Sequence, residues 1–362
     1  MIALVATNLA HRPMRTILSV LLIGIPVTLM LTLVGLSRGF VEDTSRRTRG
    51  IGADVIVRST AVGSMSLNNM PEKLVARLAQ IPHVSLTTGV ANHLVSAGLI
   101  GVAGIDVPVF ARMSGGFKFR EGHSFEKDDD ILLDAYYARQ VQVHAGDKVK
   151  LLNHDWTVAG IVEPGKLSHI FLPLRVVQDL DGVGGKVSQI YLKVDNPANV
   201  QSVIDELTKL LPGYWVISVD DMVSLTSVDN VPFLRPFLNV IIGVAVLIGA
   251  AVASLSMYMA IMQRTREIGI LKSLGASKLW IVRIILLEAL CLGLGGSILG
   301  ILLSFVSRWS LARLVPASLP QAIVPSWWPI AGAIAIGAAV AGALYPGMIA
   351  ARQDPIEALA YE

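Results

Sequence analysis

The residues of this chain that could carry out chemistry do not assemble into a known catalytic motif. Gly185–Val187 and Gly165–Leu167 are each a Gly-Lys pair followed by an aliphatic residue, so both lack the Ser or Thr that holds Mg²⁺ in a phosphate-binding loop. No serine has the glycine-flanked pattern of a nucleophile elbow. We therefore expect that the chain is not an enzyme, and that any ATP hydrolysis takes place on another subunit.

Metal chemistry also lacks a motif. No two histidines of the polar middle of the chain have HExxH or i, i+4 spacing; these are His83, His93, His123, His144, His154 and His169. Asp128–Asp130 is an acidic run without a second carboxylate cluster at calcium-loop spacing. A scatter of surface or hydrogen-bonded histidines and a solvated acidic loop are favoured over metal sites, so we expect no metal and no cofactor on this chain.

Glu288 is the most informative ionisable residue, because it lies within an apolar run. A carboxylate inside a membrane span is costly and faces the bundle interior or water, which makes it a functional candidate. The alternative is that it lies near the cytoplasmic edge and pairs locally, with Arg283 or a residue of the preceding loop. Under that alternative, a neutral glutamine leaves transport almost unchanged.

The elements that position these residues are membrane helices. With 53% hydrophobic and 16% charged residues, the chain is too apolar for a wholly soluble protein. Residues 38–235 contain 20 Lys+Arg and 22 Asp+Glu, against 10 and 5 in the remainder, so the basic excess flanks the apolar part. No basic face with interleaved aromatic residues indicates nucleic-acid binding. The single cysteine, Cys291, excludes an intramolecular disulfide.

Four apolar runs can each cross a bilayer. The first has 22 uncharged residues, about 33 Å as a helix. A cleaved signal peptide is the competing interpretation, but the run is longer than a signal sequence and no small-residue cleavage site follows it. The third run is rich in glycine and is expected to pack closely against another helix. The runs are Thr16–Ser37, Phe237–Met262, Leu279–Ser307 and Trp327–Ala351.

Short-loop charge predicts the orientation. On one side of the spans we count eight basic residues, and on the short loop of the other side only Arg308 and Arg313. Both termini are therefore expected in the cytoplasm of a multi-pass protein. The eight are Arg12, Arg15, Arg264, Arg266, Lys272, Lys278, Arg283 and Arg352.

The segment between the first two spans has the composition of a soluble domain, with no run long enough to cross a membrane. Alternation predicts strands and 3–4 residue spacing predicts amphipathic helices, so the insert is expected to be α+β. Its ends, Ser37–Gly50 and Asp221–Pro232, are expected to continue the spans outward as stalks. Predicted strands are Asp54–Ser59, Ile131–Asp134, Lys148–Asn153, Trp156–Val162, His169–Leu172, Gln189–Val194 and Tyr214–Val219; predicted helices are Pro71–Gln80, Ala135–Val141 and Pro197–Leu211.

The predicted fold is thus a membrane all-α bundle of four transmembrane helices with an inserted α+β extracytoplasmic domain. The segments are 1–37 (cytoplasmic start and helix 1), 38–232 (external domain with stalk ends), 233–262 (helix 2), 263–278 (cytoplasmic coupling helix), 279–307 (helix 3), 308–326 (short external loop), 327–351 (helix 4) and 352–362 (cytoplasmic tail).

The loop Arg264–Trp280 is too polar for a membrane core. Ile268, Leu271 and Leu274 are expected on one helical face, and Gly275 suits a left-handed cap. A short amphipathic helix on the cytoplasmic surface follows. Docking into a partner's groove and resting on lipid are equally supported by the periodicity alone.

These segments resemble the MacB/FtsX-like permease family of ABC transporters. R-T-R-E-I-G-I-L-K-S-L-G-A (Arg264–Ala276) is similar to the family's signature loop and is followed by E-A-L and a glycine-rich span. Asn8–Thr16 is similar to its N-terminal segment, and Tyr345–Leu359 to its Asp-Pro-Ile-Glu-Ala-Leu ending. His144–Leu151 and Trp156–Val162 resemble the MacB core domain. The likeness covers nearly the whole chain.

The resemblance implies a homodimeric permease in a bacterial inner membrane, bound to two copies of a separate ATPase that holds ATP and Mg²⁺. It also implies mechanotransmission, in which a coupling helix relays ATPase movement to the external domain. The implied coupling residues are Arg264, Arg266, Glu267, Gly269, Lys272, Leu274 and Gly275, with Glu267 and Lys272 as polar contacts and the glycines allowing close approach.

Two functions remain open. The first is export or extraction of a hydrophobic or amphipathic substrate (drug, haem, lipid, peptide or lipoprotein), with a membrane-fusion or periplasmic protein as a further candidate partner. The second is an FtsX-like signalling subunit that activates a cell-wall hydrolase without transport. The size of the external domain favours export. Unlike the longest family members, the sequence shows no fused ATPase domain and no four-helix-sized external insertion.

Overall fold

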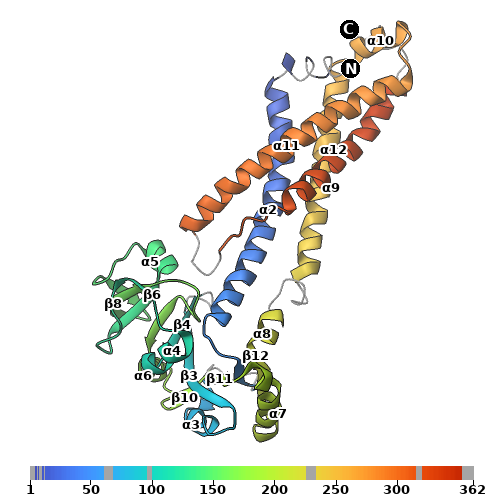
Figure 1. Ribbon diagram of the computed structural model, residues 1–362. Helices are drawn as coiled ribbons and strands as arrows, with labels where there is room; N and C mark the ends of the chain where they lie inside the picture. Colours follow the sequence, from blue (N-terminus) through green and yellow to red (C-terminus); the bar gives the residue numbers. More distant parts are fainter. Residues whose placement is uncertain are drawn as a thin grey trace. The chain divides into compact units, whose positions relative to one another are not determined.

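The computed structural model describes residues 5, 7, 10–11, 13–60, 68–95, 100–225, 234–314 and 320–352. The chain divides into two compact units (Figure 1). Unit 1 comprises residues 1–38, 232–311 and 321–362, and unit 2 comprises residues 39–231 and 312–320. Helix α2 (Pro13–Arg49) contributes residues to both units.

Unit 1 is built from long apolar helices. Besides α2 they are α9 (Leu234–Met262), α11 (Lys278–Leu314) and α12 (Trp327–Arg352), with the short helix α10 (Thr265–Ser273) between α9 and α11. In the described part of the chain, four helices are long and apolar enough to cross a membrane. The predicted number of spans is therefore confirmed.

Glycines let the helices of unit 1 approach closely. A Cβ on Gly296 would lie 2.5 Å from Cγ2 of Ile23, and one on Gly300 would lie 2.5 Å from Cβ of Val27. Helix α11 thus packs directly against α2, and the close packing predicted for the glycine-rich span is confirmed. Likewise, a Cβ on Gly342 of α12 would lie 2.1 Å from the carbonyl oxygen of Ala250 of α9.

Unit 2 contains a ten-stranded mixed sheet in the order β12-β1-β11-β3-β4-β9-β6-β8-β5, with β7 paired to β8. A two-stranded sheet pairs β10 with β2. The strands are β1 (Val55–Ser59), β2 (Met70–Pro71), β3 (Val84–Val95), β4 (Ile100–Ile105), β5 (Phe119–Gly122), β6 (Asp130–Asp134), β7 (Lys148–Leu151), β8 (His154–Val162), β9 (Ile170–Pro173), β10 (Lys186–Val187), β11 (Gln189–Val194) and β12 (Tyr214–Ser218). The helices are α3 (Lys73–Leu78), α4 (Val107–Ser114), α5 (Ala135–Val141), α6 (Leu174–Leu180), the 3₁₀ helix η1 (Pro197–Asn199), α7 (Val200–Leu210) and α8 (Val219–Leu225).

The sheet buries side chains on both of its faces. Along β9, Ile170 and Leu172 join one apolar core with residues of α5 and α6, while Phe171 joins another core with residues of α4. Along β11, Ile190 and Leu192 pack in the core that α3 and α7 cover, whereas Tyr191 between them packs in the same core as Phe171. This period of two is what a pleated strand between helix layers requires. The α+β class predicted for the insert is confirmed.

Each of the seven predicted strands corresponds to a strand of the structure. The sequence did not predict β2, β3, β4, β5, β10, α4 and α6. Helix α11 continues to Leu314, into the segment predicted as a loop at 308–326. Hydropathy marks the end of the apolar run, but no Gly or Pro stops the helix there. Of the stalk predicted at Asp221–Pro232, α8 ends at Leu225 and the remainder lies outside the described residues, as does most of the tail at 352–362.

Candidate functional site

The ionisable residue within the apolar run lies in a cluster of three charged side chains in unit 1. Glu288 Oε1 lies 3.1 Å from Nη2 of Arg15, and Glu288 Oε2 lies 3.5 Å from Nη1 of Arg264. The Glu288 side chain is 4% exposed, and those of the two arginines are 18% and 11% exposed. A buried carboxylate loses its hydration, and here the two close guanidinium groups offset that cost.

Three elements supply this cluster. Arg15 lies in the first turn of α2, Glu288 in α11, and Arg264 is the N-cap residue of α10. One turn further along α2, the hydroxyls of Ser19 and Ser256 are 2.6 Å apart, which links α2 to α9 as well. The cluster therefore connects the start of the short helix α10 to two of the long helices.

Both interpretations of Glu288 find support in its surroundings, because it is buried inside the bundle and it also pairs with a residue of the preceding loop, Arg264, and not with Arg283. A residue five positions earlier in a helix lies about 140° around its axis, so Arg283 faces away and is exposed. The second partner, Arg15, was missed by sequence reasoning. The sequence places Arg15 only among the basic residues that flank the spans. Arg15 and Glu288 are 273 positions apart, so no spacing pattern in the sequence predicts their contact.

Helix α10 has an exposed face and a buried face. The exposed side chains of Arg266, Glu267, Ile270 and Leu274 recur at helical spacing, with Ile270 43% and Leu274 79% exposed. This face combines charged and apolar side chains, as protein interfaces do. Leu274 was predicted on one helical face with Ile268 and Leu271, but it follows the end of α10 at Ser273 and is 79% exposed, whereas the other two are half-buried.

Three other predicted coupling residues, Gly269, Arg264 and Lys272, are buried or make contacts within unit 1. Gly269 is buried, so its position does not support a role in close approach to a partner. Arg264 turns inward to Glu288. Lys272 donates from Nζ to the carbonyl of Ala351 at 3.1 Å and so caps the end of α12. Gly275 follows α10 with φ +95°, the left-handed conformation that the sequence predicted.

A cavity of about 340 Å³ lies beside the charged cluster, all within unit 1. Its walls come from the end of α9, from α10 and from the start of α11, and they are mostly aliphatic. Its polar lining consists of Arg264, Glu267 and Glu288, together with Trp280 at one wall.

In unit 2 each of the six histidines has a carboxylate oxygen 2.5–3.6 Å from a ring nitrogen. Among the described residues, no three His, Cys, Asp or Glu side chains are grouped as metal ligands would be. Asp130 of the acidic run is buried and accepts from the backbone N–H groups of Glu126 and Lys127, so this residue stabilises a turn. The pairs are His83–Asp195, His93–Asp181, His123–Glu126, His144–Glu121, His154–Asp129 and His169–Asp134.

Two family profiles match this chain. The MacB-like periplasmic core domain matches residues 16–210, and the FtsX-like permease C-terminal domain matches residues 239–355. This chain belongs to the MacB/FtsX-like permease family. The first match contains most of unit 2, and the second contains α10 and the Glu288 cluster except for Arg15.

Curated relatives of this permease share low identity over much of its length. An uncharacterized ABC transporter permease of Methanocaldococcus jannaschii is 28% identical, covering 67% of this chain and 66% of its own. The macrolide export ATP-binding/permease protein MacB of Sodalis glossinidius is 25% identical, covering 99% of this chain and 60% of its own. The chain thus spans about two fifths to two thirds of the length of the curated relatives it matches.

Among solved structures, the periplasmic region of MacB from Actinobacillus actinomycetemcomitans is similar with a TM-score of 0.37 and 17% identity, covering 48% of this chain and 92% of that one. Four apolar helices and the family assignment make this permease a membrane protein, consistent with a bacterial inner membrane.

Proposed function

We propose that this permease couples ATP hydrolysis by a separate ATPase subunit to movement of its unit 2, and so exports or extracts a hydrophobic or amphipathic substrate. The substrate classes are a drug, haem, a lipid, a peptide or a lipoprotein. The chain itself is no enzyme and binds no cofactor or metal; ATP and Mg²⁺ belong to the partner. Two ATPase copies serve a homodimer of this chain.

The observation that carries the proposal is the path from α10 to α2. The exposed face of α10 receives the ATPase, and the N-cap residue of the same helix is held by Glu288, which also holds Arg15 of α2. A displacement of α10 therefore acts on α2, whose residues continue into unit 2. Because packed interfaces shift between discrete arrangements, a small displacement at α10 can be passed on.

The proposed orientation places α10 and both termini in the cytoplasm and unit 2 outside the membrane. It is supported by the basic residues beside α10, where ATP is available to the partner, and by their scarcity on the opposite short loop. A periplasmic or membrane-fusion protein would then meet unit 2 from outside.

The test is a reconstituted complex of the permease and its ATPase in proteoliposomes. The triple variant Glu267→Ala, Ile270→Ala, Leu274→Ala removes the exposed face of α10 without touching the Glu288 cluster. We expect loss of ATPase binding and of permease-stimulated turnover. Lys193→Ala, a substitution in unit 2 outside that face, is the matched control and should retain both.

Unchanged binding and turnover in the triple variant would show that α10 is not the docking element. ATP-dependent uptake of a test compound into inside-out vesicles, in which the ATPase faces the bulk solution, supports transport. Intact ATPase coupling without efflux, together with a wall-hydrolysis defect in cells, would support the FtsX-like signalling function instead.

A further inference from the structure

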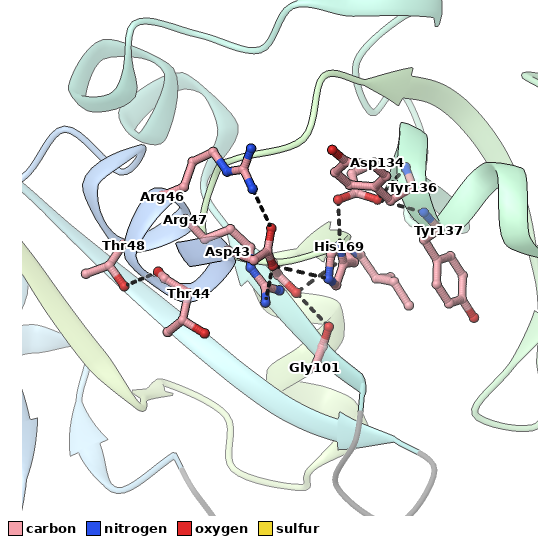
Figure 2. Close-up of polar contacts among 12 residues, drawn as sticks. Asp43, Thr44, Arg46, Arg47, Thr48, Gly101, Asp134, Tyr136, Tyr137 and His169 are labelled. Atoms are coloured by element: carbon pink, nitrogen blue, oxygen red, sulfur yellow. Dashed lines mark hydrogen bonds and ion pairs between the residues drawn. The ribbon is translucent and has the colours of Figure 1, made fainter. Parts of the chain in front are cut away.

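A second buried charged cluster lies at the other end of α2, entirely within unit 2 (Figure 2). Asp43 of α2 lies 2.6 Å from Nη2 of Arg47 and, through Oδ2, 3.9 Å from Nε2 of His169. On the opposite side of its ring, His169 Nδ1 lies 2.5 Å from Oδ2 of Asp134. The side chains of Asp43, His169 and Asp134 are at most 3% exposed.

The sheet register brings these groups together. Strands β6 and β9 pair antiparallel, with Leu133 opposite Ile170, so the next position places Asp134 opposite His169. The backbone confirms this, because Asp134 N–H donates to the His169 carbonyl at 2.8 Å. The segment before β9 also contacts α2 directly, since Leu167 N–H donates to the Arg47 carbonyl at 3.1 Å.

The contacts of Asp134 fix one ring nitrogen. Asp134 is the N-cap residue of α5, and its Oδ1 accepts from the N–H groups of Tyr136 and Tyr137 at 3.0 and 2.8 Å. Such donors favour the ionised carboxylate, which can only accept. A proton on Nδ1 lets His169 donate to the remaining oxygen of this carboxylate across the 2.5 Å contact.

The second ring nitrogen lacks a partner. Nε2 of His169 and Oδ2 of Asp43 are both buried, and neither has a hydrogen-bond partner in the described part of the chain. Arg47 contacts that oxygen as an ion pair without hydrogen-bond geometry. If Nε2 carries a lone pair, two buried acceptors face each other at 3.9 Å, which is a costly arrangement.

We propose that His169 binds a second proton, at Nε2, and that the resulting imidazolium joins the sheet to α2 by bridging Asp134 and Asp43. With a neutral ring, Asp43, Asp134 and Arg47, whose side chains are at most 15% exposed, sum to one negative charge, and the proton cancels it. Arg46 lies 3.6 Å from Asp43, but its side chain is 56% exposed and its charge is screened by solvent. A small closure of the 3.9 Å gap then forms a charge-assisted hydrogen bond.

Other occupants fit less well. A metal ion would have only two ligands, Nε2 and Asp43, and would lie beside the Arg47 guanidinium. A bridging water needs about 4.5–5.5 Å between its two partners, since each hydrogen bond is about 2.8 Å long. The charged groups that contact this cluster in the described residues are Asp43, Arg46 and Arg47 of α2 and Asp134 of β6, with Arg46 at 3.6 Å from Asp43 and half exposed.

A proton held here would tie the strength of the α2 joint to the acidity on the side of the membrane where unit 2 lies. This consequence rests on the proposed function, whereas the proton site itself does not. His169 is then a positioning residue for the movement of unit 2, and loss of the proton at high pH loosens the joint.

The experiment is magic-angle-spinning ¹⁵N NMR of the full-length protein, labelled at histidine, in lipid at pH 7.5. A free imidazole is mostly neutral there, because its ordinary pKa is about 6.5. We expect an imidazolium signal that disappears in His169→Gln and in Asp43→Asn. In the latter variant the new amide can donate to a neutral Nε2, so the proton is no longer needed.

The thermal stability of the protein adds a second readout. Raising the pH should lower the Tm of the wild type more than that of Asp43→Asn, because only the wild type relies on the bound proton. His154→Gln, which alters an exposed pair of the same type, should keep the wild-type profile. If His169→Gln fails to fold, a chain with His169 as its sole histidine supplies the assignment.

A neutral His169 at pH 7.5, or an imidazolium that persists in Asp43→Asn, overturns the proposal. Both measurements are made without the ATPase. A failed proton site therefore leaves the proposed coupling function untouched, and a failed coupling function leaves the proton site testable.

Discussion

The substitution Glu288→Gln tests whether the charged cluster of unit 1 holds α10 to α2. It preserves the shape of the side chain but removes the charge that two arginines share, at 3.1 Å for Arg15 and 3.5 Å for Arg264. Sequence reasoning expected little effect if Glu288 paired locally. The structure changes this expectation, because the local partners come from separate elements and are themselves mostly buried.

The magnitude follows from burial. Removing one partner of a buried ion pair costs about 3–5 kcal/mol, since the other charge is left without compensation. Here the glutamine oxygen still accepts one hydrogen bond, and the arginines can reach some water, so the cost falls at or below the lower end of this range. We expect about 2–3 kcal/mol, which is about a 30- to 150-fold change in the folding equilibrium constant.

The assay is reversible unfolding in mixed micelles, arranged as double-mutant cycles. Glu288→Gln combined with Arg264→Gln should show a coupling energy of about 1–2 kcal/mol, as should the cycle with Arg15→Gln. Arg283→Gln on the same helix is exposed and should be additive with Glu288→Gln. Additivity in all three cycles would refute the cluster as a structural link.

Further predictions concern packing, acidity and topology. Gly300→Ala should destabilise the membrane helices by about 1–3 kcal/mol, because its Cβ would meet α2 at 2.5 Å, whereas Gly337→Ala meets nothing within 4 Å and should not; unfolding in micelles distinguishes them. The pKa of Glu121 is lowered by its hydrogen bond with His144, and that of Asp195 by hydrogen bonds with Asn199 and His83. Because these folded-state pKa values lie below the unfolded ones, the stabilisation is complete above about pH 4.5 and is lost as the pH falls through the folded values; the acid melting profile of Glu121→Gln should be flatter than that of the wild type. Cysteine labelling in a Cys291→Ser background should place α10 and unit 2 on opposite sides of the membrane, and labelling of both from one side would disprove the orientation.

Sequence patterns predicted elements whose signals are local. The range of α5 was predicted to the residue, because Asp134 caps a short amphipathic run, and β11 alternates cleanly between its two covered faces. Strand β3 lies in the interior of the sheet, yet it holds Thr87–Gly89 and Asn92 and was missed. Its pairing with β11 and β4 makes it a strand, and single-sequence propensity does not contain that information.

The candidate site shows the same division. The existence of α10, its glycine terminus and the importance of Glu288 follow from composition and spacing. Two features depend on how α2 and α11 pack through their glycines. These are the exposed face of α10 and the contact between Arg15 and Glu288. Such tertiary pairing over a separation of 273 residues has no periodic signature in one sequence.

The central claim is that α10 passes the movement of the ATPase to α2 through Arg264 and Glu288. Double electron–electron resonance between spin labels on unit 2 of the two copies in the reconstituted complex, with and without ATP, tests it most directly. The account predicts an ATP-dependent distance change in the wild type that is lost in Arg264→Gln while the ATPase stays bound. An unaltered distance change in that variant would contradict it.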